Sequence, residues 1–162
     1  MKNLIRLRDG VAELAPDDAW ELLRDVTEAL PAGEIILPLK NWLALESGAG
    51  HGVWLSPDDD PQRLDGHLDE LPLIVIDFPS FRDGRGYSLA YLLRSRLGWR
   101  GELRAVGDVL RDQLAHMRQC GFDAFAVRED KSAEDALKGL AGLSVLYGRS
   151  VIEPRPLFRR RS

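Results

Sequence analysis

The stretch LIVIDF, at Leu73–Phe78, decides the fold class of this 162-residue chain. Five of its six residues are apolar, and the run lacks the alternation of a half-exposed strand, which is typical of a strand buried on both faces in a parallel sheet. Turn-forming residues follow it, and then Tyr87–Leu97, in which leucines recur at helical spacing. The sequence therefore predicts a βα unit with this strand as its first element.

Similar units are expected on both sides of this one. The expected strands are Glu34–Leu37, Val53–Leu55, Leu103–Val106 and Phe122–Val127. The expected helices are Leu39–Glu46, a helix starting at Pro61 with Asp60 as its cap, Val109–Gln119, and Ser132–Leu140. Parallel strands need crossovers, and helices supply them, so five consecutive βα units predict an α/β protein with a mostly parallel sheet. Periodicity leaves an open doubly wound sheet and a partial (β/α) barrel as alternatives.

Length and composition predict one soluble domain, because 162 residues with 44% apolar content suffice for a single core. Residues 1–30 are expected to form an N-terminal extension with one helix from about Asp17 to Leu30, and residues 148–162 a basic, flexible tail. The lone Cys120 excludes an internal disulfide and favours a reducing cytoplasm. No apolar run approaches the roughly 18–20 residues of a membrane span, so no membrane contact is expected.

The formal charge of −4 is unevenly distributed along the chain. Residues 1–80 hold 6 basic and 16 acidic residues, a net of −10, whereas residues 81–162 hold 16 basic and 10 acidic residues, a net of +6. Such asymmetry indicates either an anion site in the basic half or charges scattered over a solvated surface. The acidic isoelectric point argues against nucleic acid as a main ligand.

In a parallel sheet, ligands bind beyond the carboxyl ends of the strands, and the exit of Leu73–Phe78 is rich in polar residues. Asp77 needs a partner there, for which Arg82, Arg85 and Arg111 are the near candidates, and it is also a candidate acid–base catalyst. Arg82 and Arg85 flank a glycine turn and predict an anion site. The structural alternative is a tight turn with an internal ion pair.

The exit of the next strand supplies a second group of candidates. Asp108 is a candidate catalyst, with the alternative that it caps a helix starting at Val109. Arg111, Gln113 and Arg128 complete the anion- or partner-binding set. Together these residues predict a charge network at one edge of the sheet.

Other features indicate no particular cofactor. The chain has neither a Walker A loop nor the dinucleotide fingerprint. His116 and Cys120 share a helix face but are too few for a metal site, so we expect no metal and a structural cysteine. Trp42 and Trp54 fit core packing or a flat cofactor.

The residues around these candidates resemble a known family. Asp77-Phe78-Pro79, FRDGRGYSLAYLLR (Phe81–Arg94) and GELRAVGDVLRDQLAHMRQCGFDAF (Gly101–Phe125) are similar to an uncharacterised bacterial family, the domain of unknown function numbered 934. The stretches IILPLKNWLAL and GVWLSPDDD extend the resemblance more loosely. Members are labelled probable oxidoreductases of sulfite reduction, because their genes lie beside those for sulfite reductase and phosphoadenylylsulfate reductase. The resemblance implies no catalytic residue and no cofactor.

The resemblance and the basic half lead to one main expectation and two alternatives. We expect an accessory protein of assimilatory sulfite and sulfate reduction that binds an oxyanion, or an acidic face of sulfite reductase or phosphoadenylylsulfate reductase. The alternatives are an enzyme acting on a small anionic substrate, and a scaffold in which two half-barrels pair as a homodimer. One cysteine cannot hold a four-cysteine iron–sulfur cluster, so redox activity would require a flavin or pterin bound without a fingerprint.

Overall fold

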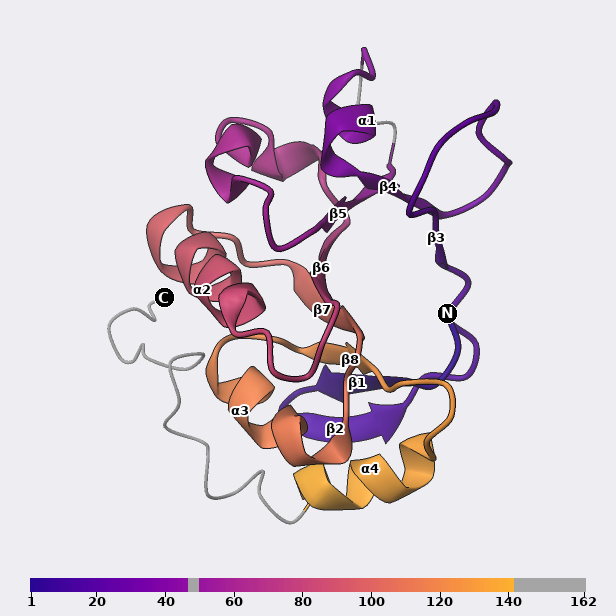
Figure 1. Cartoon of the computed structure of the whole chain (residues 1–162), viewed down its shortest axis with the longest axis vertical. Helices are drawn as coiled ribbons and strands as arrows, with labels where there is room; N and C mark the ends of the chain where they lie inside the picture. The colour runs from indigo at the N-terminus through magenta and orange to yellow at the C-terminus, as the bar shows by residue number, and fades with distance from the viewer. Residues whose placement is uncertain (47–49, 142–162) are drawn as a thin grey trace.

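A computed structural model describes residues 1–46 and 50–141 as a mixed α/β fold with an eight-stranded sheet curled into a half-barrel (Figure 1). The strands are β1 (Leu4–Arg8), β2 (Val11–Leu14), β3 (Glu21–Leu22), β4 (Ile35–Pro38), β5 (Gly52–Leu55), β6 (Leu73–Phe78), β7 (Glu102–Gly107) and β8 (Ala124–Ala126). Their order is β2-β1-β8-β7-β6-β5-β4-β3. Neighbours from β3 to β8 are parallel, whereas β1 pairs antiparallel with both β8 and β2. The sequence prediction of a mostly parallel sheet is confirmed, in its partial-barrel form.

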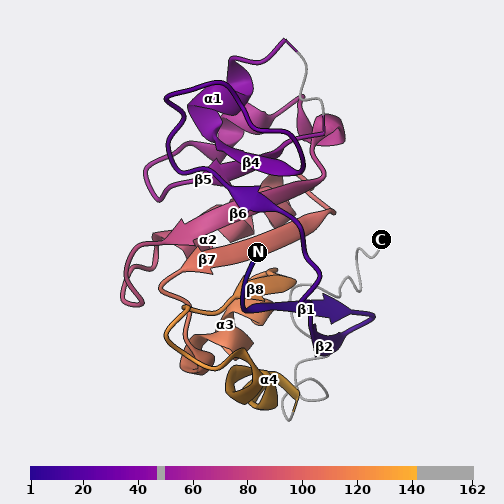
Figure 2. The ribbon, with the colours of Figure 1, turned by 90° about the vertical axis from the view of Figure 1, so that its right-hand side faces the viewer.

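The helices lie on one face of this sheet (Figure 2). They are α1 (Leu39–Leu43), α2 (Arg85–Tyr91), α3 (Leu114–Gln119) and α4 (Ala133–Ala141). A π-helical turn at Leu92–Arg96 continues α2, and 3-10 helices span Pro61–Leu64, Leu68–Glu70 and Arg111–Gln113. The Asp60 carboxylate accepts a hydrogen bond from Gln62 N at 2.9 Å, which confirms the expected cap, although the helix it begins is 3-10.

Strand β6 is buried along its whole length, as its apolar run predicts. Ile74, Ile76 and Phe78 belong to the large core cluster between the sheet and the helices. Leu73 and Val75 point to the concave face, where they belong to a separate cluster. Both faces of this strand therefore require a covering layer.

The N-terminal segment supplies the cover of the concave face. Trp20 and Leu22 pack against the cluster of buried residues there, which includes Ile36 and Val106. Figures 1 and 2 both show this segment on the side of the sheet opposite the helices. The half-barrel is thus closed on its inner side by residues before β4.

The prediction of a helix from Asp17 to Leu30 is wrong. The first strands form a hairpin whose Asp9-Gly10 turn has positive φ at both residues, 52° and 80°. Two positive φ values match the type I′ turn that fits the twist of paired strands. Beyond the hairpin, β3 pairs with β4. Long-range strand pairing, which local periodicity does not report, overrides helix propensity here.

The other elements match the sequence-based ranges more closely. The expected strand Leu73–Phe78 has the same bounds as β6, and the expected helix Ser132–Leu140 differs by one residue at each end from α4. The expected helix from Val109 begins only at the 3-10 turn Arg111–Gln113 and continues as α3. The expected basic tail, 148–162, lies outside the described residues.

Candidate functional site

A hollow of about 770 Å³ opens at the carboxyl edge of the half-barrel, and we call it the main hollow. It is lined by Met1, Lys2, Trp20–Leu22, Arg24, Val106, Gly107 and Ala126–Asp130. The lining joins residues around β3 to the ends of β7 and β8, which lie far from β3 in the strand order. The curl of the sheet therefore brings its β3 edge across from β7 and β8, and the hollow lies between them.

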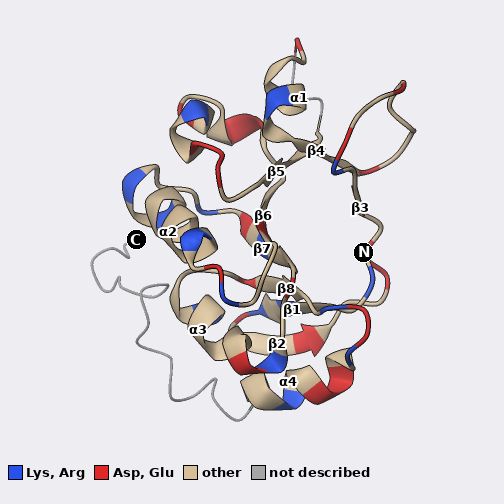
Figure 3. Cartoon of the chain, in the orientation of Figure 1, with Lys and Arg blue, Asp and Glu red and all other residues tan. Residues whose placement is uncertain are grey.

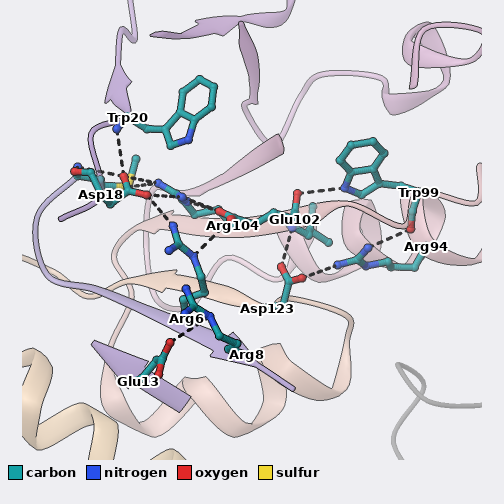
Figure 4. Close-up of polar contacts among 12 residues, drawn as sticks. Arg6, Arg8, Glu13, Asp18, Trp20, Arg94, Trp99, Glu102, Arg104 and Asp123 are labelled. Atoms are coloured by element: carbon teal, nitrogen blue, oxygen red, sulfur yellow. Dashed lines mark hydrogen bonds and ion pairs between the residues drawn. The ribbon is translucent and has the colours of Figure 1, made fainter. Parts of the chain in front are cut away.

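A buried ion-pair network anchors the N-terminal segment below this hollow (Figure 4). Arg104 on β7 is fully buried, and its Nη1 and Nη2 lie 3.1 and 2.9 Å from the two carboxylate oxygens of Asp18. The Asp18 carboxylate also accepts hydrogen bonds from Arg6 Nη2 at 2.7 Å and from the backbone N–H of Trp20 at 3.1 Å. The Asp18 carboxylate thus fixes the backbone at Trp20, which lines the main hollow.

The pKa of the Asp18 carboxyl follows from this environment. Burial raises the pKa, but hydrogen bonding and charge from Arg104, with the N-terminal ammonium, lower it more. The net result is a pKa below the ordinary 3.8. Asp18 is therefore held as a carboxylate, which keeps its three cationic neighbours paired.

Asp77 lies at the end of β6 with its side chain 8% exposed, and its partner is Arg24. Arg24 Nη1 donates to Asp77 Oδ1 at 2.9 Å, and its guanidinium carbon lies 5.6 Å from the centre of the Trp54 ring. The expected partner among Arg82, Arg85 and Arg111 is thus replaced by an arginine of the N-terminal extension. Arg24 also lines the main hollow, so this ion pair joins Asp77 to it.

Gly107 makes the position of Asp77 possible. Its φ of +100° is in the region that favours glycine, and a Cβ there would lie 2.8 Å from Asp77 Oδ1 and against the carbonyl oxygen of Phe78. The backbone of β7 therefore approaches the end of β6 more closely than any side chain at position 107 permits.

Asp108 does not cap a helix at Val109. Its Oδ2 accepts the backbone N–H of Phe81 at 2.7 Å, and its Oδ1 accepts Arg128 Nη1 at 2.6 Å. The Gln113 side chain has the cap-like contact instead, because its Oε1 accepts the Leu110 N–H at 3.1 Å. Asp108 therefore connects the loop after β6 to the segment after β8.

Gln113 and Arg128 extend this connection. Gln113 Nε2 donates to the Phe81 carbonyl at 2.6 Å, so both backbone polar groups of Phe81 are bonded to side chains from beyond β7. Arg128 also contacts Asp130, with Nε 2.7 Å from Oδ1. The hydrogen bonds that Arg128 donates to Asp130 and Asp108 raise its pKa, so it lines the main hollow as a fixed cation.

Acidic and basic residues are interspersed along the ribbon (Figure 3), and the remaining candidate arginines contact different parts of the edge. Arg85 pairs with Asp83 at 2.7 Å and Asp58 at 2.6 Å, and its side-chain hydrogen bonds lower the pKa of Asp83 to about 2. Arg111 Nη1 lies 3.0 Å from Asp135 Oδ1 on α4. The Arg82 guanidinium lies 5.5 Å from the Phe81 ring centre. The sequence-based site residues thus come together as Asp108, Gln113 and Arg128, whereas Arg82, Arg85 and Arg111 have separate contacts.

Cys120 and His116 form a contact without the properties of a nucleophile. The Cys120 Sγ lies 3.9 Å from His116 Nε2, and the His116 ring packs on Tyr87 with 4.5 Å between ring centres. Burial raises the pKa of the Cys120 thiol. A thiol with a raised pKa is mostly protonated near neutral pH, so this cysteine fits a packing role.

Residues 1–46 and 50–141 contain neither a membrane-spanning helix nor a candidate metal site. No helix there has both the length and the apolarity to cross a membrane. No group of three or more histidine, cysteine, aspartate or glutamate side chains in that part of the chain is arranged to hold a metal ion.

The fold and the main hollow define an α/β half-barrel protein with a ligand-sized hollow at the carboxyl edge of its parallel strands. Residues 52–158 match the family model described as a bacterial protein of unknown function, DUF934, and the chain belongs to this family. No curated protein and no solved structure shows a significant match to the chain. The matched range includes β5 to β8 but not Trp20 or Arg24.

Sequence reasoning missed Trp20 and Arg24, because both fall within the segment expected to be helical. The alternation of Trp20, Glu21 and Leu22 is a two-residue period, which indicates a strand. It is only three residues long, so β3 was recognisable from sequence only together with the strand it pairs with.

Proposed function

We propose that this protein is an accessory component of assimilatory sulfite and sulfate reduction that binds an anionic organic ligand in the main hollow. The observation that carries the binding role is the hollow itself, at the edge where parallel α/β proteins bind ligands. Its volume of about 770 Å³ is within the usual range for cofactor-sized ligands. The pathway assignment rests on the family resemblance and on the gene neighbourhood from which that family takes its label.

The lining supports a ligand with a flat apolar part and an anionic part. Trp20, Val106 and Ala126 supply apolar surface. Arg24 and Arg128 supply guanidinium groups whose side chains are 50% and 39% exposed. Because both guanidinium groups are partly exposed and have several N–H donors, a ligand anion can share them with their carboxylate partners, Asp77 and Asp108. A nucleotide combines these two parts at a size that suits the hollow.

A growth experiment tests the pathway assignment. A strain deleted for the gene is expected to grow poorly on sulfate and normally on cysteine, and the intact gene is expected to restore growth. Arg128→Gln is expected to restore growth poorly, whereas Arg85→Gln, which removes an arginine outside the hollow, is expected to restore it fully. Normal growth of the deleted strain on sulfate would contradict the assignment.

An acidic protein partner is the other form of this proposal. Sulfite reductase and phosphoadenylylsulfate reductase are the candidate partners, and Arg82, Arg85 and Arg111 are the exposed cations on the edge. Pull-down of either enzyme by the intact protein, lost in an Arg82→Ala/Arg85→Ala variant, would support this form. If the intact protein associates with neither enzyme, this form of the proposal is contradicted.

An enzyme acting on a small anionic substrate is a second candidate function. Asp77 favours it, because a carboxylate that is 8% exposed and contacts a cation of the hollow can serve as an acid–base group. Asp108 is the second candidate catalyst, although its two oxygens already accept from Phe81 and Arg128. An Asp77→Asn variant that keeps its fold and fully restores growth would contradict a catalytic role for Asp77.

A scaffold that forms a homodimer is favoured by one feature of the sheet. The edge strand β2 exposes Val11 and Leu14, at 62% and 38%, and no other strand of residues 1–46 and 50–141 pairs with its outer side. Edges of this kind pair readily with a second chain. Light scattering that reports a dimer for the intact protein and a monomer for Val11→Lys would support pairing through β2, whereas a monomeric intact protein would contradict it.

A further inference from the structure

A second hollow, of about 210 Å³, lies at the same edge beside β4 and β5 and shares Arg24 with the main hollow; we call it the Asn41–Trp54 pocket. It is lined by Arg24, Asp25, Pro38–Asn41, Trp54, Ser56 and Asp59. These residues belong to the segment after β3, to the junction of β4 and α1, and to β5 and the loop after it. A volume below the usual range for cofactors and drug-sized ligands admits only a small molecule.

Two polar atoms of the lining are buried and lack a hydrogen-bond partner within residues 1–46 and 50–141. They are Nε1 of Trp54 and Oδ1 of Asn41. By contrast, the indole N–H groups of Trp42 and Trp99 donate to backbone carbonyls at 3.0 and 3.1 Å. Buried polar groups in native proteins are nearly always bonded to protein, water or ligand. Two such atoms on residues that line one hollow therefore indicate a polar occupant.

The two atoms require opposite chemistry from that occupant. An indole N–H only donates, so Trp54 requires an acceptor oxygen, whereas the amide oxygen of Asn41 requires a donor. The charged side chains of the lining likewise include both signs of charge. Arg24 and Lys40 are cations, and Asp25 and Asp59 are anions. Of the anions, Asp59 already accepts the Ser56 N–H through Oδ2 at 2.8 Å, whereas Asp25 has no hydrogen bond or ion pair with residues 1–46 and 50–141 and is the better placed to receive a ligand cation.

We propose that the Asn41–Trp54 pocket binds a small zwitterion of the α-amino-acid type. Its carboxylate accepts from Trp54 Nε1 and is attracted by Lys40 and Arg24. Its ammonium donates to Asn41 Oδ1 and is attracted by Asp25. A molecule with only one of these groups leaves one buried atom unpartnered, so the pocket discriminates against it. This proposal does not rest on the proposed function: the two hollows share Arg24, but Asn41 and Trp54 do not line the main hollow.

Calorimetric titration of the full chain with L-serine tests this proposal, with glycolate and ethanolamine as probes that lack the ammonium and the carboxylate. We expect L-serine to bind and each single-charge probe to bind at least about tenfold more weakly, as the loss of one charge-assisted hydrogen bond predicts. Asn41→Ala and Trp54→Phe are expected to weaken L-serine binding by a similar factor. Trp20→Phe, which alters a tryptophan of the other hollow, is expected to leave it unchanged.

Trp54→Phe is the more conservative of the two variants. Trp54→Phe retains an aromatic ring beneath Arg24 and removes only the N–H and part of the ring, and circular dichroism checks its fold. Binding of L-serine that is unchanged in a folded Trp54→Phe, equal binding of glycolate or ethanolamine, or no heat from L-serine at 10 mM (about the weakest affinity that such a site offers) would each overturn the proposal. So would a crystal structure grown with L-serine in which only water bridges the two atoms.

Discussion

Arg104 on β7 and Asp18 in the N-terminal segment form a two-pronged ion pair in which both side chains are buried, at 0% and 1% exposure. The residues are 86 positions apart in sequence. Their contact joins the centre of the sheet to the segment that covers its concave face (Figure 4). The main hollow depends on this contact, because Trp20 and Arg24 follow Asp18 closely along the chain.

Asp18→Asn is expected to lower the free energy of unfolding by about 1.5–3 kcal/mol, because the buried Arg104 guanidinium loses one counter-charge and keeps the other, Glu102, whose Oε2 lies 2.6 Å from Nη2. Asp17→Asn, which changes the neighbouring exposed carboxylate, is expected to alter it by less than about 0.5 kcal/mol. Urea unfolding followed by circular dichroism measures both. Equal stability of the two variants would contradict the assigned role of Asp18.

The stabilisation by Asp18 is expected to depend on pH in a defined direction. Its pKa in the folded chain is below the ordinary 3.8, so the unfolded chain takes up the proton first as pH falls. The stabilisation is therefore complete above the unfolded-state pKa and is lost as pH falls from 3.8 towards the folded-state value. Urea unfolding from pH 7 to pH 3 should show the difference between the intact chain and Asp18→Asn narrowing at the acid end. A difference that stays constant across this range would disprove the linkage.

Gly107→Ala is expected to cost at least about 2 kcal/mol, because it combines a positive φ with a clash against Phe78 and Asp77. Gly84→Ala is the matched control, since nothing lies within 4 Å of a Cβ there and its φ is −87°. Thermal unfolding of the two variants checks the expectation. A Gly107→Ala protein as stable as Gly84→Ala would show that the close approach of β7 to β6 is not tight.

Arg24 and Asp77 are expected to be energetically coupled. A double-mutant cycle with Arg24→Gln and Asp77→Asn should give a coupling of about 1 kcal/mol, a modest value because Arg24 is half exposed. The same cycle with Arg85→Gln in place of Arg24→Gln should give none, since Arg85 pairs with Asp58 and Asp83. If Asp77 were coupled to Arg85 and not to Arg24, its partner would be one of the arginines expected from the sequence, and the Arg24–Asp77 ion pair would be contradicted.

Sequence patterning was sufficient for the central strands and not for the edges of the sheet. The bounds of β6 follow from an uninterrupted apolar run, because burial on both faces leaves a strong pattern. Strands β1 and β3 are stabilised by pairing with β8 and β4, and their positions depend on partners more than ten residues away. In the N-terminal extension, the Asp9-Gly10 pair is a local feature from which the hairpin could have been predicted.

The candidate site shows the same division. The position of Asp77 and Asp108 at the carboxyl edge follows from their place after apolar runs. Their partners do not, because Arg24 reaches Asp77 only through the curl of the sheet, and Arg128 reaches Asp108 across neighbouring strands. Proximity in sequence favoured Arg82 and Arg85, which pair or stack with closer neighbours instead.

Calorimetric titration with adenosine 3′,5′-bisphosphate tests most directly whether the main hollow binds an anionic ligand. This probe carries a flat ring and two anionic groups, and inorganic sulfite serves as the small-anion comparison. We predict that adenosine 3′,5′-bisphosphate binds, that Arg128→Gln weakens this binding at least about tenfold, that Arg85→Gln leaves it unchanged, and that sulfite binds more weakly. No heat with either probe, or an equal loss in both folded variants, would contradict this prediction.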